Sequence, residues 1–159
     1  DSSVRSSDTK APQKQWSWGD VGIATGNNCQ WQAAWQRTYF EDPIQINVTQ
    51  SQVDVEFCLS TECIESAVGV HHMQWFDDSG WELDGDGNGT SPGCESRPFW
   101  ANAFFTNDNF CYPGVAYSNH WLNEVTPLNT GEVVFDHSGS ASGSCASMLR
   151  YIREVGTPF

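Results

Sequence analysis

Residues 44–58 read IQINVTQSQVDVEFC, and two segments of this stretch alternate between apolar and polar side chains. In residues 44–49 isoleucine and valine alternate with polar residues, and in residues 53–58 valine and phenylalanine do the same. A period of two places every second side chain on one face, so each segment predicts a β-strand with one buried face. The polar residues 49–52 between them predict the connection of a hairpin.

Further strands are predicted along the chain. In residues 30–40 the spacing of the aromatic and apolar residues fits one face of a helix and also fits one face of a strand. Bulky aromatic residues at alternate positions favour the strand. Turns are predicted at residues 77–80, 107–109 and 129–131, which are rich in Asp, Asn and Gly. The remaining predicted strands are residues 66–76, 99–106, 115–122, 132–137 and 148–155. Strands at short intervals without a convincing long helix predict an all-β fold, a small antiparallel β-barrel or sandwich.

The chain has 159 residues, which is the size of one domain. Residues 1–15 are rich in serine and nearly free of apolar residues, which predicts a flexible N-terminal tail. Composition changes at Trp16, so we expect a single folded domain over residues 16–159. The start at Asp1, without an initiator Met, is expected of a mature form whose targeting segment has been removed.

The six cysteines predict three disulfides. Their number is even, and the sequence contains no CxxC pair and no cysteine–histidine cluster of the kind that binds zinc. Fifteen pairings are open at this point. Disulfides and two glycosylation sequons, at Asn47 and Asn88, predict a secreted, extracellular glycoprotein. The cysteines are Cys29, Cys58, Cys63, Cys94, Cys111 and Cys145.

The charge balance is strongly acidic. Twenty Asp and Glu residues against seven Lys and Arg give a net charge of −13, and no lysine follows Lys14. Such a surface repels phosphate backbones, so nucleic acid is not an expected partner, and a cationic partner or a divalent cation suits it better. No apolar run is long enough for a membrane span. We expect a monomer.

One motif predicts a metal site. Asp84, Asp86 and Asn88, followed by Glu95, match the spacing of a calcium-binding EF-hand loop. The flanking sequences do not predict helices, and Pro92 lies inside the motif. The alternative is an acidic, glycine-rich surface loop, and we expect no bound cofactor.

No motif predicts catalysis. The adjacent His71 and His72 would point to opposite faces of a strand. Residues 139–143 resemble a nucleophile elbow but have Ala141 where serine is required, so a flexible Gly/Ser loop is predicted. Of the eight tryptophans we expect six or more in the core. A row of exposed tryptophans would instead indicate a lectin-like surface.

The chain size, the cysteine set from Cys29 to Cys145 and the start at Asp1 resemble the secreted necrotrophic effectors of plant-pathogenic fungi. These are host-selective toxins and virulence factors that induce necrosis. The resemblance implies a β-barrel, a pro-domain removed by a kexin-type protease, dependence on intact disulfides and recognition by a host protein outside the plant cell. An effector that induces cell death through a host protein is therefore the expected function, and an enzyme is not expected. The alternatives are an extracellular carbohydrate- or calcium-binding module and a small secreted hydrolase.

Overall fold

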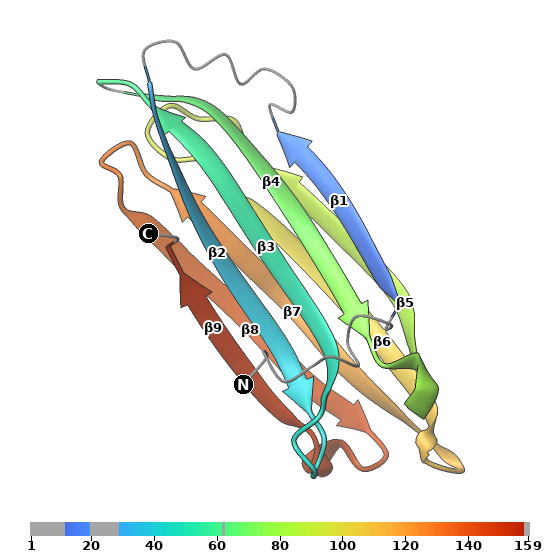
Figure 1. Cartoon of the computed structure of the whole chain (residues 1–159). Coiled ribbons are helices and arrows are strands. Elements are labelled where there is room, and N and C mark those ends of the chain that lie inside the picture. Colours follow the sequence, from blue (N-terminus) through green and yellow to red (C-terminus); the bar gives the residue numbers. More distant parts are fainter. Residues whose placement is uncertain (1–11, 20–28, 62, 158–159) are drawn as a thin grey trace.

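The structure is a computed structural model that describes residues 12–19, 29–61 and 63–157. Two antiparallel sheets face each other (Figure 1). In spatial order, the first sheet contains β1 (Gln13–Gly19), β4 (Ile64–Trp75), β3 (Asn47–Leu59), β2 (Gln30–Glu41) and β9 (Arg150–Gly156). The second contains β5 (Trp81–Thr90), β6 (Phe99–Cys111), β7 (Gly114–Pro127) and β8 (Val133–Gly143). The predicted all-β fold is confirmed, and it is a sandwich of two sheets rather than the closed barrel that the family resemblance implies.

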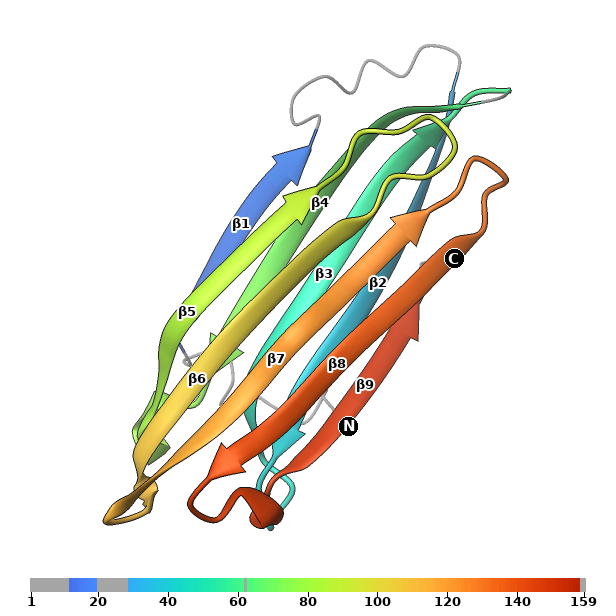
Figure 2. The ribbon, with the colours of Figure 1, turned by 180° about the vertical axis from the view of Figure 1, so that it is seen from behind.

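Figure 1 and Figure 2, which view the molecule from opposite sides, show the two sheets stacked face to face. The turns between strands gather at the two ends of the sandwich, and the short 3₁₀ turns η3 (Asp77–Ser79) and η4 (Ala146–Met148) lie at the same end. Within the described residues no helix is long and apolar enough to cross a membrane.

The stretch 44–58 forms one strand and not the predicted hairpin. β3 runs without a turn from Asn47 to Leu59 and pairs with β2 on one side and β4 on the other. Thr49 and Ser51 keep the alternation going, and their side chains are buried between the sheets. The prediction was wrong here because polar residues on the inward face were taken for a turn.

Three other segments with turn-like composition are also strands. The predicted flexible loop at 139–143 is the end of β8, where the ring of Tyr151 lies directly against Gly139. The acidic, glycine-rich segment 84–89 is part of β5, and the predicted turn at 107–109 lies within the irregular end of β6. The predicted strand over residues 30–40 is confirmed as β2.

Strand β1 begins before the predicted domain boundary. Gln13, Lys14 and Gln15 pair with β4, so the end of the predicted tail belongs to the first sheet. The Nζ atom of Lys14 lies 2.8 Å from Asp86 Oδ2, and Trp16 Nε1 donates to Asp86 Oδ1 at 3.0 Å. These bonds join β1 to β5 along one edge of the sandwich. The rest of the tail, residues 1–11, lies outside the described residues.

The interior contains two apolar clusters. One cluster lies toward the end of the sandwich where β3 turns into β4, and the other lies toward the end where β2 turns into β3. The first contains Ala34, Val53, Val55, Phe57, Ile64, Ala67, Phe99, Ala101 and Val125. The second contains Phe40, Val48, Met73, Trp81, Ala103, Phe105 and Ala116.

A band of buried polar side chains, here called the polar belt, separates these clusters. Each of the strands β2, β3, β4 and β7 places polar residues between its residues of the first and of the second cluster. The polar belt consists of Gln36, Thr38, Thr49, Ser51, His71, Ser118, His120 and Asn123.

Hydrogen bonds across the sandwich connect the polar belt. His120 Nδ1 is 2.8 Å from Thr38 Oγ1, and His120 Nε2 is 3.0 Å from Thr49 Oγ1. Asn123 Nδ2 donates to the carbonyl oxygens of Gln36 and Ser51 at 3.0 and 3.1 Å. Because buried polar groups are costly unless they are bonded, the polar belt fixes which strand of one sheet lies over which strand of the other.

Burial keeps both core histidines neutral at physiological pH. Desolvation lowers the pKa of His71 to about 4, although the nearby Asp86 carboxylate opposes this shift. Desolvation, and to a smaller extent the neighbouring His71, lowers the pKa of His120 to about 3. The prediction that His71 and His72 point to opposite faces is confirmed, since His72 pairs with Asp54 at 2.8 Å on the outer face.

Most tryptophans do not lie in the core, contrary to the sequence prediction. Trp81 is fully buried, Trp18 and Trp75 pack against the clusters, and Trp16 and Trp121 are exposed. The other three are half-buried and lie in strands on the outer faces of the sheets. The alternation of aromatic residues predicted these strands correctly. It did not show which face of each strand is covered by the other sheet.

Candidate functional site

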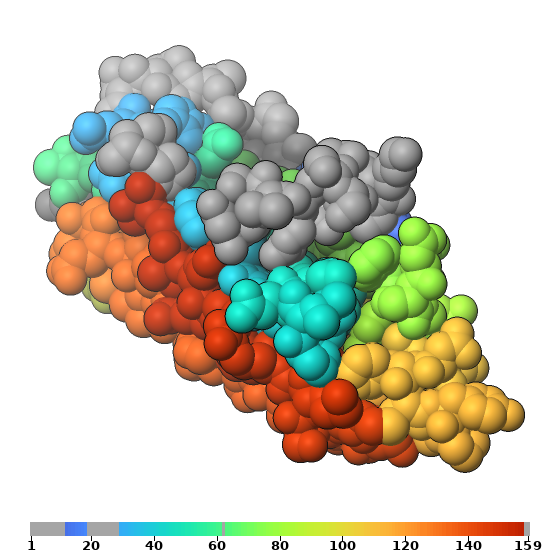
Figure 3. Space-filling model, turned by 60° about the horizontal axis from the view of Figure 1, so that its bottom comes forward, coloured from blue at the N-terminus to red at the C-terminus, as the bar shows by residue number. Residues whose placement is uncertain are grey.

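One end of the sandwich presents exposed apolar side chains on neighbouring loops. We call this surface, formed by residues 42–46, 76–80, 108–113 and 144–149, the loop end. Ile44, Tyr112 and Met148 are 74%, 82% and 49% exposed, and exposed apolar side chains are informative where several lie on one surface. Figure 3 shows this end of the molecule, with the teal segment between the orange-red and amber ones.

Hydrogen bonds within the β2–β3 loop hold Ile44 outward. The Asp42 carboxylate oxygen Oδ1 accepts from the backbone N–H groups of Ile44 and Ile46 at 3.0 and 2.9 Å. Gln45 has a φ of 66°, a left-handed conformation that closes the turn. Ile46 packs against the second apolar cluster, so the base of the loop is anchored while its tip faces solvent.

The β6–β7 loop, together with the irregular end of β6 from Asn107 onward, is held in a similar way. Asn107 Oδ1 accepts from the N–H groups of Asn109 and Phe110 at 2.8 and 2.9 Å, and Asn107 Nδ2 donates to Ser79 O at 2.9 Å. These bonds connect the loop that carries Tyr112 to η3. Phe110 packs against the second apolar cluster and anchors this loop as well.

Covalent and ionic contacts join the loops into one surface. The disulfide between Cys111 and Cys145 links the β6–β7 loop to the β8–β9 loop. Glu41 and Arg150, on paired strands, form an ion pair at 3.5 Å at the base of the β2–β3 and β8–β9 loops. The loop end is therefore a preformed surface, which lowers the entropy lost on binding.

Most charged side chains near the exposed apolar residues are acidic, and the exposed Arg150 at the base of the β8–β9 loop is paired with Glu41. Asp77, Asp78 and Asp108 are exposed in the loop end, and Asp42 is half-buried beside Ile44. An apolar centre with a charged rim is a common arrangement in protein–protein interfaces. The acidic rim favours a partner with a basic surface.

Sequence reasoning did not find this site. Ile44 and Met148 were assigned to predicted strands, and Tyr112 belonged to no motif or predicted element. A signal was present, because Pro43 precedes Ile44 and Pro113 follows Tyr112, and proline beside an exposed apolar residue is typical of a loop tip. Only the fold shows that these loops share one end.

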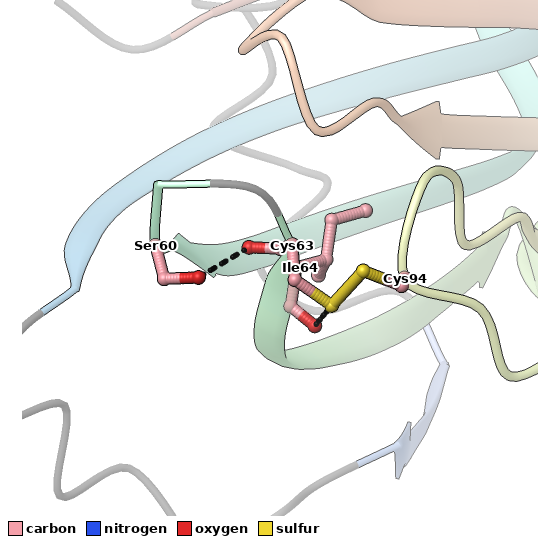
Figure 4. Close-up of a disulfide and its surroundings, with 4 residues drawn as sticks. All are labelled: Ser60, Cys63, Ile64 and Cys94. Atoms are coloured by element: carbon pink, nitrogen blue, oxygen red, sulfur yellow. Dashed lines mark hydrogen bonds between the residues drawn. A yellow bond between two sulfur atoms is a disulfide. The ribbon is translucent and has the colours of Figure 1, made fainter.

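All six cysteines are paired, as predicted, and the structure gives their connectivity. The pairs are Cys29–Cys58, Cys63–Cys94 and Cys111–Cys145. Figure 4 shows the second pair, which ties the β3–β4 turn to the loop before β6. Ser60 Oγ donates to Cys63 O at 3.2 Å in that turn. Three disulfides indicate an oxidising environment.

The residues of the calcium motif lie along strand β5 and after it, and not in a loop between helices. Asp86 bonds to Lys14 and Trp16, while Asp84 lies at a bulge and Glu95 lies in the following loop. Within the described residues no three carboxylate, histidine or cysteine side chains lie together as metal ligands. The half-buried Asn88 of the motif lies in β5, and Asn47, which carries the other sequon, is the first residue of β3.

We expect calcium to leave the stability unchanged. At matched ionic strength the thermal midpoints in calcium, magnesium and sodium should agree, because Asp86 is already paired with a lysine. A calcium-specific rise in the midpoint that Asp86→Ala abolishes would contradict this expectation, since a ligand at a hundredfold excess over its dissociation constant stabilises by about 2.7 kcal/mol.

Two of the four histidines, His71 and His120, are fully buried. Ser51 Oγ is 2.7 Å from His71 Nε2, a contact that resembles a nucleophile and its base. Both residues are fully buried in the polar belt, so no substrate reaches them. The exposed His137 is hydrogen-bonded to Tyr151 at 3.0 Å, and burial lowers the pKa of His137.

No protein-family model matches the chain, and comparison with curated proteins and with solved structures gives no match.

Proposed function

We propose that this protein is a secreted effector that induces host cell death by binding a host protein, and that it is not an enzyme. The observation that carries the proposal is the loop end. Three large apolar side chains are held outward on loops whose bases are anchored in the core, so exposure there is built into the fold. Such residues, with Tyr prominent among them, are the usual energetic centres of protein interfaces.

The charge of the loop end supports a protein partner over a membrane. Its exposed acidic residues would be repelled by anionic lipid headgroups, whereas a basic protein surface complements them. The disulfide Cys111–Cys145 explains why such an effector would need intact disulfides, since it joins two of the loops that present the apolar residues.

The burial of Ser51 and His71 supports a binding function over hydrolysis. A hydrolase needs its nucleophile and base to contact the substrate, and the described histidines that are exposed have no serine or cysteine nucleophile among their hydrogen-bond partners.

Infiltration of purified protein into leaves of several plant genotypes tests the proposal. We expect necrosis in some genotypes and none in others, because a host protein that varies between genotypes determines the response. Reduced and alkylated protein should give no necrosis in any genotype. No necrosis in any genotype, or equal necrosis in all of them, would contradict the proposal.

A further inference from the structure

The outer face of the β5–β8 sheet carries a second surface, independent of the loop end. Aromatic side chains of β6 and β7 lie on this face, and we call them the aromatic platform: Trp100, Phe104, Tyr117 and Trp121. Trp121 is 52% exposed and Tyr117 is 39% exposed. These two residues are four positions apart on β7, a span of about 13 Å.

Contacts hold the Trp121 ring in place at the surface. Trp121 Nε1 donates to Ser140 Oγ on β8 at 2.7 Å, and the ring packs edge-on against Phe104 with centroids 5.0 Å apart. Trp121 follows the inward-facing His120, so strand alternation places the indole on the outer face, at the β-bulge between His120 and Leu122. The indole is therefore oriented before any ligand binds.

Small and polar residues surround these rings. Gly87 and Gly89 on β5 have no side chains, so the Asn102 amide lies close to Gly87 and the Trp100 indole lies over Gly89. Asn102 on β6 is half-buried on this face, and Ser138 and Ser142 on β8 are exposed. Their amide and hydroxyl groups can donate and accept hydrogen bonds beside the rings.

The charge of this face excludes anionic ligands. Strands β5, β6, β7 and β8 contain no lysine and no arginine, whereas Glu124 and Asp136 lie side by side on β7 and β8. Burial and the neighbouring Asp136 carboxylate raise the pKa of Glu124. A ligand for this face must bring apolar surface and hydroxyl groups but no negative charge.

We propose that the aromatic platform binds a neutral polysaccharide. Sugar rings present apolar C–H faces that stack on exposed aromatic rings, and their hydroxyl groups bond to amide and hydroxyl side chains. The platform offers both features along neighbouring strands of one sheet face. This activity is separate from host-protein recognition at the loop end.

Sedimentation with insoluble cellulose, chitin and xylan tests the proposal. We expect the disulfide-intact protein to sediment with at least one of them, and Trp121→Ala to weaken that binding at least tenfold. Trp16→Ala is the matched control, because Trp16 is 46% exposed but lies on β1, away from the platform. That variant should bind like the wild type.

Two results would overturn the proposal. One is no sedimentation with any of the three polymers. The other is binding that Trp121→Ala and a second variant, Tyr117→Ala, both leave unchanged while the thermal midpoints show that they are folded. In the first case, loss of necrosis in Trp121→Ala would assign the platform to a protein partner.

Discussion

Lowering the pH from 7 to 4 is expected to reduce the free energy of unfolding by roughly 6 kcal/mol. The pKa values of His71 and His120 in the folded protein are about 4 and about 3, whereas in the unfolded chain both are near 6.5. Below pH 6.5 the unfolded chain therefore binds protons that the native protein does not bind, and stability falls as the pH falls. The loss is on the order of 3 kcal/mol for each histidine, and the two together are comparable with the lower end of typical domain stabilities, about 5 kcal/mol.

Denaturant titrations at pH 7, 6.5, 6, 5 and 4.5 measure most of this loss before most carboxylates titrate. His120→Gln and His71→Gln should each remove part of the pH dependence, and His72→Gln should keep most of it, because His72 is on the outer face. The raised pKa of Glu124 acts in the opposite direction, since its protonation favours the folded state. Equal stability at pH 6.5 and 4.5 would show that the buried histidines are not neutral.

Replacing Cys111 and Cys145 together by serine is expected to destabilise the protein by about 4 kcal/mol. The two residues are 34 positions apart, and the disulfide limits the freedom of this loop in the unfolded chain. The same change frees the β6–β7 loop from the β8–β9 loop. We therefore expect host-dependent necrosis to be lost even at a temperature where the variant is folded.

The pair Cys29–Cys58 provides a matched control at the other end of the sandwich. Its separation of 29 residues gives a similar stability cost, but it does not touch the loop end. Thermal midpoints and leaf infiltration should show two variants of similar stability, of which only the Cys29/Cys58 variant still induces necrosis. Equal activity of both folded variants would show that this disulfide does not position the loops.

Much of the strand content could be predicted from the alternation of side chains, and the errors have a common cause. Residues 49–52 and 139–143 have the composition of turns, yet each lies within a strand. Thr49 and Ser51 belong to the buried polar belt, and Gly139 leaves room for the ring of Tyr151. A polar or small residue on an inward face keeps the period of two but loses the apolar signal, so composition alone cannot distinguish it from a turn.

The candidate site was harder to predict than the fold. The even cysteine count predicted that all six residues pair, but the pairing depends on which turns meet at each end. The exposure of Ile44 depends on two bonds to Asp42, and its nearness to Met148 depends on the pairing of β2 with β9. The sharpest motif, at Asp84 and Asp86, lies in a strand, because spacing alone does not supply the flanking helices that an EF-hand needs.

A dose–response series of necrosis with loop-end variants tests the central claim most directly. Tyr112→Ala and Ile44→Ser remove side chains that are mostly exposed, so both proteins should keep the wild-type thermal midpoint. Val134→Ser is the control, because Val134 is exposed on β8, away from the loop end. We predict that Tyr112→Ala needs at least tenfold more protein for the same necrosis in a sensitive genotype, since truncating a residue at the centre of an interface costs about 2 kcal/mol or more. Full activity of Tyr112→Ala and Ile44→Ser, alone and combined, would contradict recognition through the loop end.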